Sequence, residues 1–217
     1  MAEARDNPTD CTPTRKSDPI KEMNELYNTN SIEDKTSCDS EVGGMKCSGT
    51  ETVTIVKETD MFIDYMNSAG EIIRITKQTG KSIDGSIASK LNSPNIGSKV
   101  EAKVADYIKN DMGIELTDFG NKVKNSTGQV IGDIDCATKD VLIEVKSSIA
   151  SVKISQFIKY VDNSDAQYIN VLSKKVILYI DEPLVELNSI NTQKLNELKK
   201  MGVEIVNSIN EMKGVVK

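Results

Sequence analysis

The stretch GDIDCATKDVLIEVK, residues 132–146, sets two acidic residues before a turn and a Glu-Val-Lys triplet after it. Side chains alternate across a strand, so a hairpin turning at 138–141 places Asp135 opposite Glu144. Two opposed carboxylates repel each other, and a fold tolerates the repulsion where a divalent cation lies between them. Lys146 faces the same side and can offset charge on a scissile phosphate. The hairpin therefore predicts a metal-dependent hydrolytic site.

The same spacing also fits a purely structural interpretation. A hairpin centred between Lys139 and Asp140 sets Asp133 opposite Lys146, and this pair can form a surface salt bridge. Charged side chains at strand ends commonly lie on a solvated face. The spacing by itself leaves both interpretations open.

The chain on both sides of the hairpin alternates helical and strand patterns. We expect helices at 98–112, which Gly113 ends, at 151–161, at 192–201 and at the C-terminus. We expect strands at 115–119, 129–136, 141–146, 168–172, 176–180 and 203–206. This order predicts an α/β (α+β) fold with a central mixed sheet flanked by helices.

The first half is less regular and predicts a separate small module. Residues 1–50 are polar with few apolar positions and read as poorly ordered, apart from an amphipathic patch at 20–27. Strands are expected at 52–57 and 71–76, with a short helix at 61–66. Because residues 79–98 are rich in Gly, Ser, Asn and Pro, we place a boundary there, giving an N-terminal module at 1–89 and a second domain at 90–217.

The amino-acid composition excludes several classes of catalytic and metal site. The 217 residues carry a net charge of -6, and residues 90–217 hold 17 basic and 17 acidic side chains, so the acidic excess lies in 1–89. With no histidine, histidine-based zinc sites and triads are excluded. The sequence contains no apolar run of 18 or more residues, so it predicts no membrane-spanning helix. Cys38 and Cys47 fit either a disulfide or two free thiols.

Asp135, followed nine residues later by Glu144-Val145-Lys146 on an apolar strand, resembles the PD-(D/E)XK nuclease superfamily, although Ile134 stands where the naming proline would be. The resemblance implies Asp135, Glu144 and Lys146 as catalytic residues. It also implies Glu101, on the preceding helix, as a third catalytic and metal-binding carboxylate. Ser98 and Glu101 equally fit a helix-capping box. The implied metal is Mg²⁺, with Mn²⁺ and Zn²⁺ as alternatives.

After the triplet, the segment 147–160 is similar to the Gln-and-Lys helix of many members of that superfamily. The resemblance implies Ser148, Gln156 and Lys159 as substrate-binding residues, with Tyr160 beside them. A partly exposed amphipathic helix accounts equally well for Lys159 and Tyr160.

Residues 25–28 read ELYN, which resembles the motif at the start of the toxin region in one group of contact-dependent growth inhibition effectors. That layout implies a translocation module followed by a toxin domain, at the end of a large secreted cell-surface effector. It further implies a ribonuclease that cleaves tRNA in the target-cell cytoplasm, a cognate immunity protein, an inner-membrane receptor for uptake and no stable membrane insertion. The alternatives are a DNA endonuclease and a non-catalytic interaction module.

Overall fold

The computed structural model describes residues 54–217. The expectations for the amphipathic patch at 20–27, the ELYN motif at 25–28, and Cys38 with Cys47 therefore lie outside the described residues.

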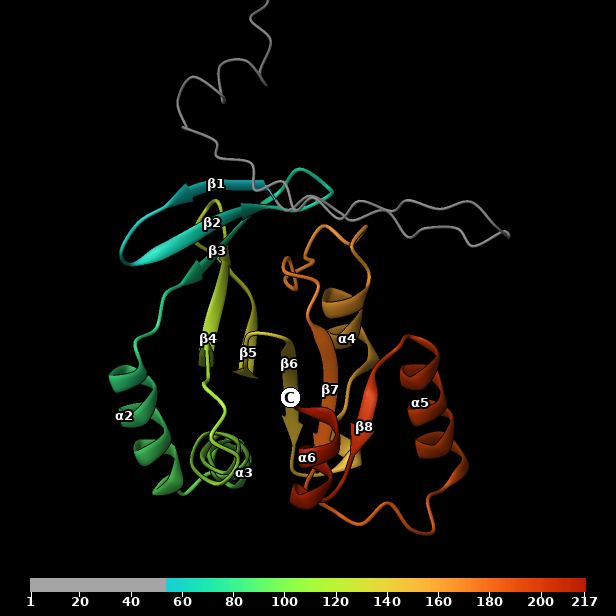
Figure 1. Cartoon of the computed structure of the whole chain (residues 1–217). Coiled ribbons are helices and arrows are strands. Elements are labelled where there is room, and N and C mark those ends of the chain that lie inside the picture. Colours follow the sequence, from blue (N-terminus) through green and yellow to red (C-terminus); the bar gives the residue numbers. More distant parts are fainter. Residues whose placement is uncertain (1–53) are drawn as a thin grey trace, which may run out of the picture.

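One eight-stranded sheet runs through the described chain, with its strands in sequence order (Figure 1). The strands are β1 (Thr54–Glu58), β2 (Phe62–Met66), β3 (Ile72–Thr76), β4 (Asp118–Asn125), β5 (Val130–Ala137), β6 (Val141–Lys146), β7 (Lys175–Ile180) and β8 (Glu204–Val206). Strands β1 to β6 pair antiparallel, whereas β6, β7 and β8 pair parallel. The predicted mixed sheet is confirmed.

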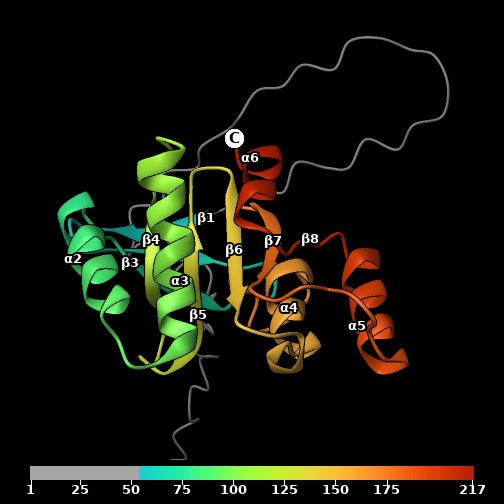
Figure 2. The same ribbon diagram turned by 90° about the horizontal axis from the view of Figure 1, so that it is seen from below.

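Helices lie on both sides of this sheet. They are α2 (Gly80–Leu91), α3 (Ile96–Asp106), α4 (Ile154–Val161), α5 (Ser189–Lys200) and α6 (Met212–Val215), with a π-helical turn at Tyr107–Asp111 and short 3-10 turns at Ile149–Ser151 and Ile209–Glu211. Figure 2 shows α2 and α3 to one side of β6, and α4 and α5 to the other. Within residues 54–217, no helix has the length and apolar character to cross a membrane.

Two apolar cores form because β6 is buried on both faces. One core packs Val141, Ile143 and Val145 of β6 against α2, α3 and α6. The other packs Leu142 against α4 and α5. A strand covered on both faces reads as a continuous apolar run, as VLIEVK nearly does. Glu144 interrupts the run and is 0% exposed, so the fold holds a carboxylate where an apolar side chain would pack.

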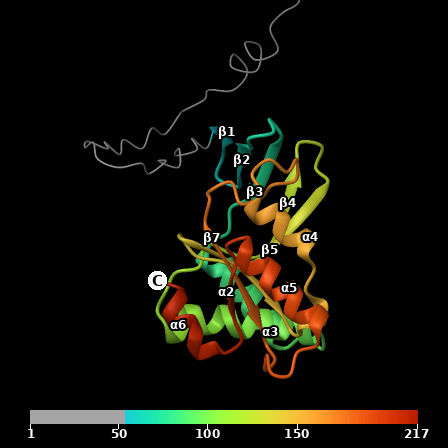
Figure 3. The same cartoon turned by 90° about the vertical axis from the view of Figure 1, so that its right-hand side faces the viewer.

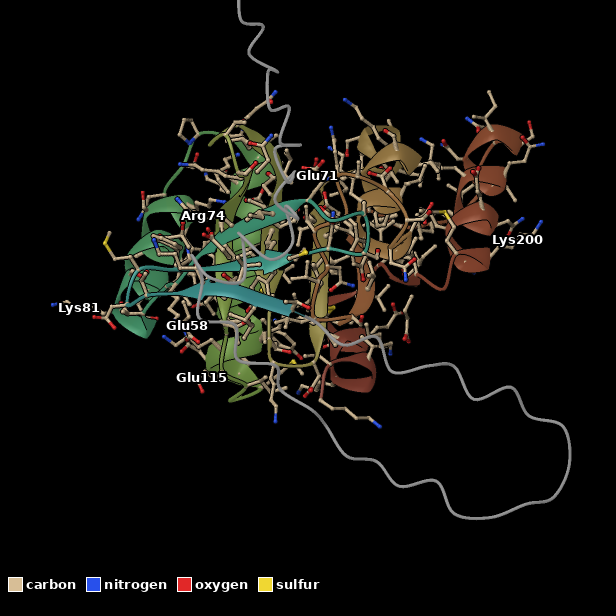
Figure 4. The ribbon with its side chains drawn as sticks, turned by 90° about the horizontal axis from the view of Figure 1, so that it is seen from above. Glu58, Glu71, Arg74, Lys81, Glu115 and Lys200 are labelled. Atoms are coloured by element: carbon tan, nitrogen blue, oxygen red, sulfur yellow. The ribbon has the colours of Figure 1, made fainter. Side chains whose placement is uncertain are left out.

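The predicted helix at 61–66 is wrong, because β2 occupies that segment. Ile63 and Tyr65 pack on the core on one side of β2, and the buried Asp64 accepts two hydrogen bonds of 2.7 Å from Arg74 of β3 on the other. The Arg74 guanidinium also stacks 3.8 Å from the Phe62 ring centroid. Figure 4 shows Arg74 on β3, viewed from above. This cross-strand pairing decides the conformation.

The predicted strand at 168–172 is also wrong. The segment is irregular, although Tyr168, Ile169 and Val171 are buried. The Asn170 side chain donates to the carbonyls of Tyr160 and Lys174 and accepts from the Lys174 N–H. This side-chain amide replaces the partners that a neighbouring strand would have supplied.

Two further segments differ from expectation. The strand predicted at 115–119 instead runs from 118 to 125, as β4. The segment 79–98, where the sequence places the module boundary, contains α2, which begins with a capping box between Thr79 and Ser82. Helix α2 crosses the predicted module boundary, and β3 pairs with β4 at Ile73 and Asn125. Figure 3 shows β1–β3 at the end of the molecule opposite α3 and α6.

Helix α3 begins earlier than the sequence predicts. Asn95 is its N-cap, since the Asn95 side chain accepts from the Ser98 N–H at 2.9 Å. Ser98 therefore lies inside the first turn, and the capping box of Ser98 with Glu101 is wrong. Gly113, with φ of +68°, follows the π-helical turn and ends the helical segment as predicted.

Replacing Asn95 by alanine is expected to lower the free energy of unfolding by about 1 kcal/mol, because the first turn loses its capping acceptor. Ser98→Ala serves as the matched control and is expected to change stability by less than about 0.5 kcal/mol. Urea denaturation of both variants measures the difference. A larger loss for Ser98→Ala than for Asn95→Ala would contradict the assignment of the cap.

Candidate active site

The hairpin turns where the sequence predicts, and Thr138 organises the turn. The Thr138 N–H donates to the Val141 carbonyl at 3.0 Å, and its side-chain oxygen accepts from the N–H groups of Asp140 and Val141 at 3.3 Å. Cys136 pairs with Ile143 and Ala137 with Leu142. This register confirms the predicted hairpin centre between residues 139 and 140.

Beyond these two pairs, the strands separate at Asp135. The Asp135 side chain takes the place of a backbone partner, because its Oδ2 accepts from the Val145 N–H at 2.9 Å. Asp135 is 5% exposed, so its carboxylate lies at the point where β5 and β6 diverge and is almost removed from water. The hairpin thus holds this carboxylate in one orientation.

Glu144 lies beside it and is bound through both carboxylate oxygens. The Tyr160 hydroxyl of α4 lies 2.6 Å from Glu144 Oε2, and Lys146 Nζ contacts Oε1. The same ammonium lies 3.8 Å from Asp135 Oδ2. Strand β6 places Glu144 and Lys146 on one face, and α4 lies against that face (Figure 1). The structure therefore brings the three predicted catalytic residues together.

The electrostatics of this cluster follow from its burial. Burial, and then the charge of Glu144, raises the pKa of Asp135 to about 8. Burial also raises the pKa of Glu144, against the lowering effects of Lys146 and Tyr160. Burial acts to lower the pKa of Lys146, but the two carboxylates outweigh it and the pKa is raised. Two buried carboxyl groups thus share the ammonium group of Lys146, an arrangement typical of functional sites.

Asp133 does not form the salt bridge with Lys146 that the structural interpretation predicts. Its carboxylate is instead 3.7 Å from Lys122 Nζ of β4, and its side chain is 43% exposed. Asp133 nevertheless contributes to the site, because its charge acts on the pKa values of both Glu144 and Lys146.

Glu101, the predicted third carboxylate, lies on α3 and forms an ion pair with Lys90 of α2. The Lys90 ammonium is also 4.7 Å from the Phe119 ring centroid. Glu101 is close enough for its charge to raise the pKa of Asp135. The structure thus places Glu101 near the cluster but in contact with Lys90 rather than with the other carboxylates.

The predicted substrate-binding residues occupy two places. Gln156 Nε2 donates to the Tyr160 hydroxyl at 3.1 Å, and Lys159 Nζ donates to the Ile131 carbonyl at 2.7 Å. Both line a cavity of about 270 Å³ that Asp133 and Tyr160 also border. Ser148 is half-buried just after β6, where its carbonyl accepts from the Ser151 hydroxyl, and it does not line this cavity.

The oxygen-only donor set suits a hard divalent cation. Asp135 and Glu144 supply two buried carboxylates, and burial raises the pKa of both, although the Lys146 ammonium acts to lower it. Within residues 54–217, no three Asp, Glu, Cys or His side chains approach one another closely enough to form a metal centre. The two carboxylates fit a cation, and Glu101 could join them only by leaving Lys90.

The sequence interpretation missed the role of Tyr160 as a partner of Glu144. Gln156 and Tyr160 are four residues apart and therefore share a face of α4, which is the one available signal. It also missed Lys90, since nothing in its spacing relates α2 to Glu101. Comparisons with family models, curated proteins and solved structures find no match to this chain.

Proposed function

We propose that the protein is a metal-dependent nuclease that hydrolyses phosphodiester bonds. The observation that carries the proposal is the cluster of Asp135, Glu144 and Lys146, in which two buried carboxylates lie around one ammonium. Such a cluster is costly for stability, because desolvated like charges repel each other. Proteins keep costly polar groups chiefly where chemistry requires them.

The residues would divide the work as follows. Asp135 and Glu144 would hold a divalent cation, which supplies Lewis-acid polarisation of the phosphate and acidifies the attacking water. Tyr160 fixes the orientation of Glu144 through the 2.6 Å hydrogen bond. Lys146 would release Glu144 when the cation binds and then stabilise negative charge developing on the phosphoryl oxygens.

The order of the elements supports the resemblance to the PD-(D/E)XK superfamily. Helix α3 with Glu101 comes first, the β5–β6 hairpin with the catalytic residues follows, and α4 with Gln156 and Lys159 comes next. Gln156 and Lys159 border the cavity beside Asp133, where they would contact a nucleic-acid backbone.

We further propose that the substrate is tRNA and that the protein acts as a toxin in the cytoplasm of target bacteria. This part of the proposal is supported by the resemblance of residues 25–28 to the ELYN motif. It implies contact-dependent growth inhibition, in which a cognate immunity protein neutralises the toxin. For an RNA substrate, either water or the ribose 2′-OH would be the nucleophile.

The full chain should be incubated with total tRNA, and separately with plasmid DNA, in Mg²⁺ or in EDTA. Asp135→Asn and Lys146→Met test the site, while Asp60→Asn and Lys199→Met, at exposed positions, are the matched controls. We expect discrete tRNA fragments in Mg²⁺ with the wild type and both controls, and none with EDTA or with either site variant.

Each other outcome has a defined meaning. Nicked plasmid with intact tRNA would move the substrate to DNA and retain the site. Cleavage that persists in both site variants would reject Asp135 and Lys146 as catalytic residues. Intact tRNA and intact DNA with a folded wild-type chain would reject the nuclease and favour an interaction module.

A further inference from the structure

A second cavity, of about 350 Å³, lies between the β2–β3 hairpin, the first residues of β4, and the 169–174 loop. Its walls are mainly apolar, with Ile63 and Tyr65 of β2 on one side and Ile169 and Leu172 of the loop on another. A cavity of this size and character can accept a small organic molecule. It is not the cavity that Gln156 and Lys159 border, and neither residue lines it.

Two of the charged side chains that line this second cavity, Asp118 and Lys174, have opposite sign and lie close together. Asp118 Oδ1 accepts from Asn121 Nδ2 at 2.7 Å, and burial raises the pKa of the Asp118 carboxyl. Lys174 Nζ donates to the Thr138 carbonyl at 2.6 Å and to Thr117 Oγ1 at 3.1 Å, and burial lowers its pKa. The two groups act on each other's pKa without forming an ion pair. Each therefore retains hydrogen-bonding capacity toward the cavity.

The charged side chains that line the cavity indicate which polar groups a ligand must carry. Lys139 is exposed where it lines the cavity, so it and Lys174 supply positive charge there. Among residues 54–217, Asp118 is the one acidic side chain in the lining. Lys77 also lines the cavity but already pairs with Glu58 at 2.6 Å. A ligand that fits these groups has an apolar body, N–H donors for Asp118 and an anionic group for Lys139.

We propose that this cavity binds a guanine nucleotide, with the N–H edge of the base on Asp118 and the phosphate near Lys139, on the turn of the hairpin. A carboxylate only accepts hydrogen bonds, so it selects a base with adjacent N–H donors. Guanine presents its ring N1–H beside its exocyclic amino group. Adenine and cytosine present an acceptor nitrogen beside the amino group and would set a lone pair against Asp118.

The cavity also lies beside the candidate active site. Ala137 and Leu142 line it, and each is two residues from a catalytic residue on the same strand, Asp135 and Glu144 respectively. Side chains two residues apart share a strand face, with about 7 Å between them. That the bound guanine belongs to a nucleic-acid substrate rests on the proposed function, whereas binding of the free nucleotide does not.

The chain contains no tryptophan, so Leu172→Trp introduces a single fluorescent reporter at a position that is 48% exposed. Guanosine 5′-monophosphate is the probe, adenosine 5′-monophosphate the comparison ligand and guanosine the test for the phosphate. We expect saturable emission changes with the guanine nucleotide. Asp118→Asn is expected to weaken its binding roughly 10-fold to 100-fold, as expected for loss of a charge-assisted hydrogen bond.

Lys139→Met is expected to weaken binding of the guanine nucleotide but not of guanosine. Glu197→Gln, an exposed carboxylate change on α5, is the matched control and should bind like the parent. Isothermal titration of the chain with Leu172 retained checks that the reporter does not block the cavity. Absence of heat and emission changes, equal affinity for both nucleotides, or unchanged binding in Asp118→Asn would overturn the proposal.

Failure of the nuclease proposal can be distinguished from failure of the nucleotide-binding proposal. Asp135→Asn is expected to bind guanosine 5′-monophosphate with the parent affinity, since Asp135 does not line this cavity. Binding without cleavage of any nucleic acid would keep the nucleotide site and reject the nuclease. Cleavage without nucleotide binding would do the reverse.

Discussion

Replacing Lys146 by methionine is expected to lower the free energy of unfolding by about 3–5 kcal/mol at pH 8, because it leaves two buried carboxylates without their cation. The lost contacts are those of Nζ with Glu144 and with Asp135 at 3.8 Å. The folded state raises the pKa of Lys146 above 10.5. The stability that its charge contributes to the fold is therefore fully present at neutral pH, and it is lost only as the pH rises above 10.5. Urea denaturation measures the loss.

The loss in Lys146→Met should shrink toward pH 4, where the carboxyl groups take up protons and no longer need a counter-charge. Nuclease activity should fall by about 10²-fold to 10³-fold, as is typical when one group that stabilises transition-state charge is removed. Lys199→Met, an exposed change on α5, controls for the lost lysine. A stable but inactive Lys146→Met variant would show that Lys146 serves the chemistry without neutralising the buried pair.

Replacing Asp135 by asparagine is expected to raise the free energy of unfolding by about 2–4 kcal/mol at pH 8. The amide oxygen of asparagine can still accept from the Val145 N–H, while the charge that repels Glu144 is removed. The same variant should have no detectable nuclease activity. Opposite effects on stability and activity are typical of a residue kept for function.

The sign of the pH dependence follows from the direction of the shift. The folded pKa of Asp135 is about 8, whereas the unfolded value is near 3.8. Between these values the folded state holds a proton that the unfolded state has lost, so the stability of the wild type falls as pH rises from 4 to 8. Asp135→Asn should flatten this decline and match the wild type near pH 4.

Thermal denaturation across this pH range, with and without Mg²⁺, tests both statements. A cation on Asp135 favours the ionised carboxylate, so Mg²⁺ should raise the melting temperature of the wild type most at high pH and leave Asp135→Asn unchanged. Asp60→Asn is the control at an exposed position. Equal pH profiles for wild type and Asp135→Asn would show that Asp135 does not titrate as proposed.

The sequence by itself determined the hairpin and its register. Two constraints agree there: a turn at 138–141, and the charged residues Glu144 and Lys146 that alternate with Ile143 and Val145. A one-residue slip would turn Glu144 and Lys146 toward the core that packs against α2 and α3, so the register is strongly specified. The strands at 71–76 and 176–180 and the helix at 192–201 also lie close to their predicted positions, as β3, β7 and α5.

Other elements depended on contacts that local periodicity does not contain. The segment 61–66 fits a helix by its spacing, but pairing of Asp64 with Arg74 makes it a strand. The segment 168–172 has strand composition, yet the Asn170 side chain supplies the backbone partners. Asn95 rather than Ser98 caps α3 because the helix begins one turn earlier.

The contacts of the candidate site also fall into those that the sequence predicts and those that only the tertiary structure shows. Spacing along one hairpin brings Asp135, Glu144 and Lys146 together, so the sequence was sufficient for them. Only the tertiary structure placed Tyr160 against Glu144, paired Glu101 with Lys90, and enclosed Asp118 with Lys174 in one cavity. These contacts join residues on different elements, and their geometry depends on how helices and loops pack on the sheet, which no local pattern encodes.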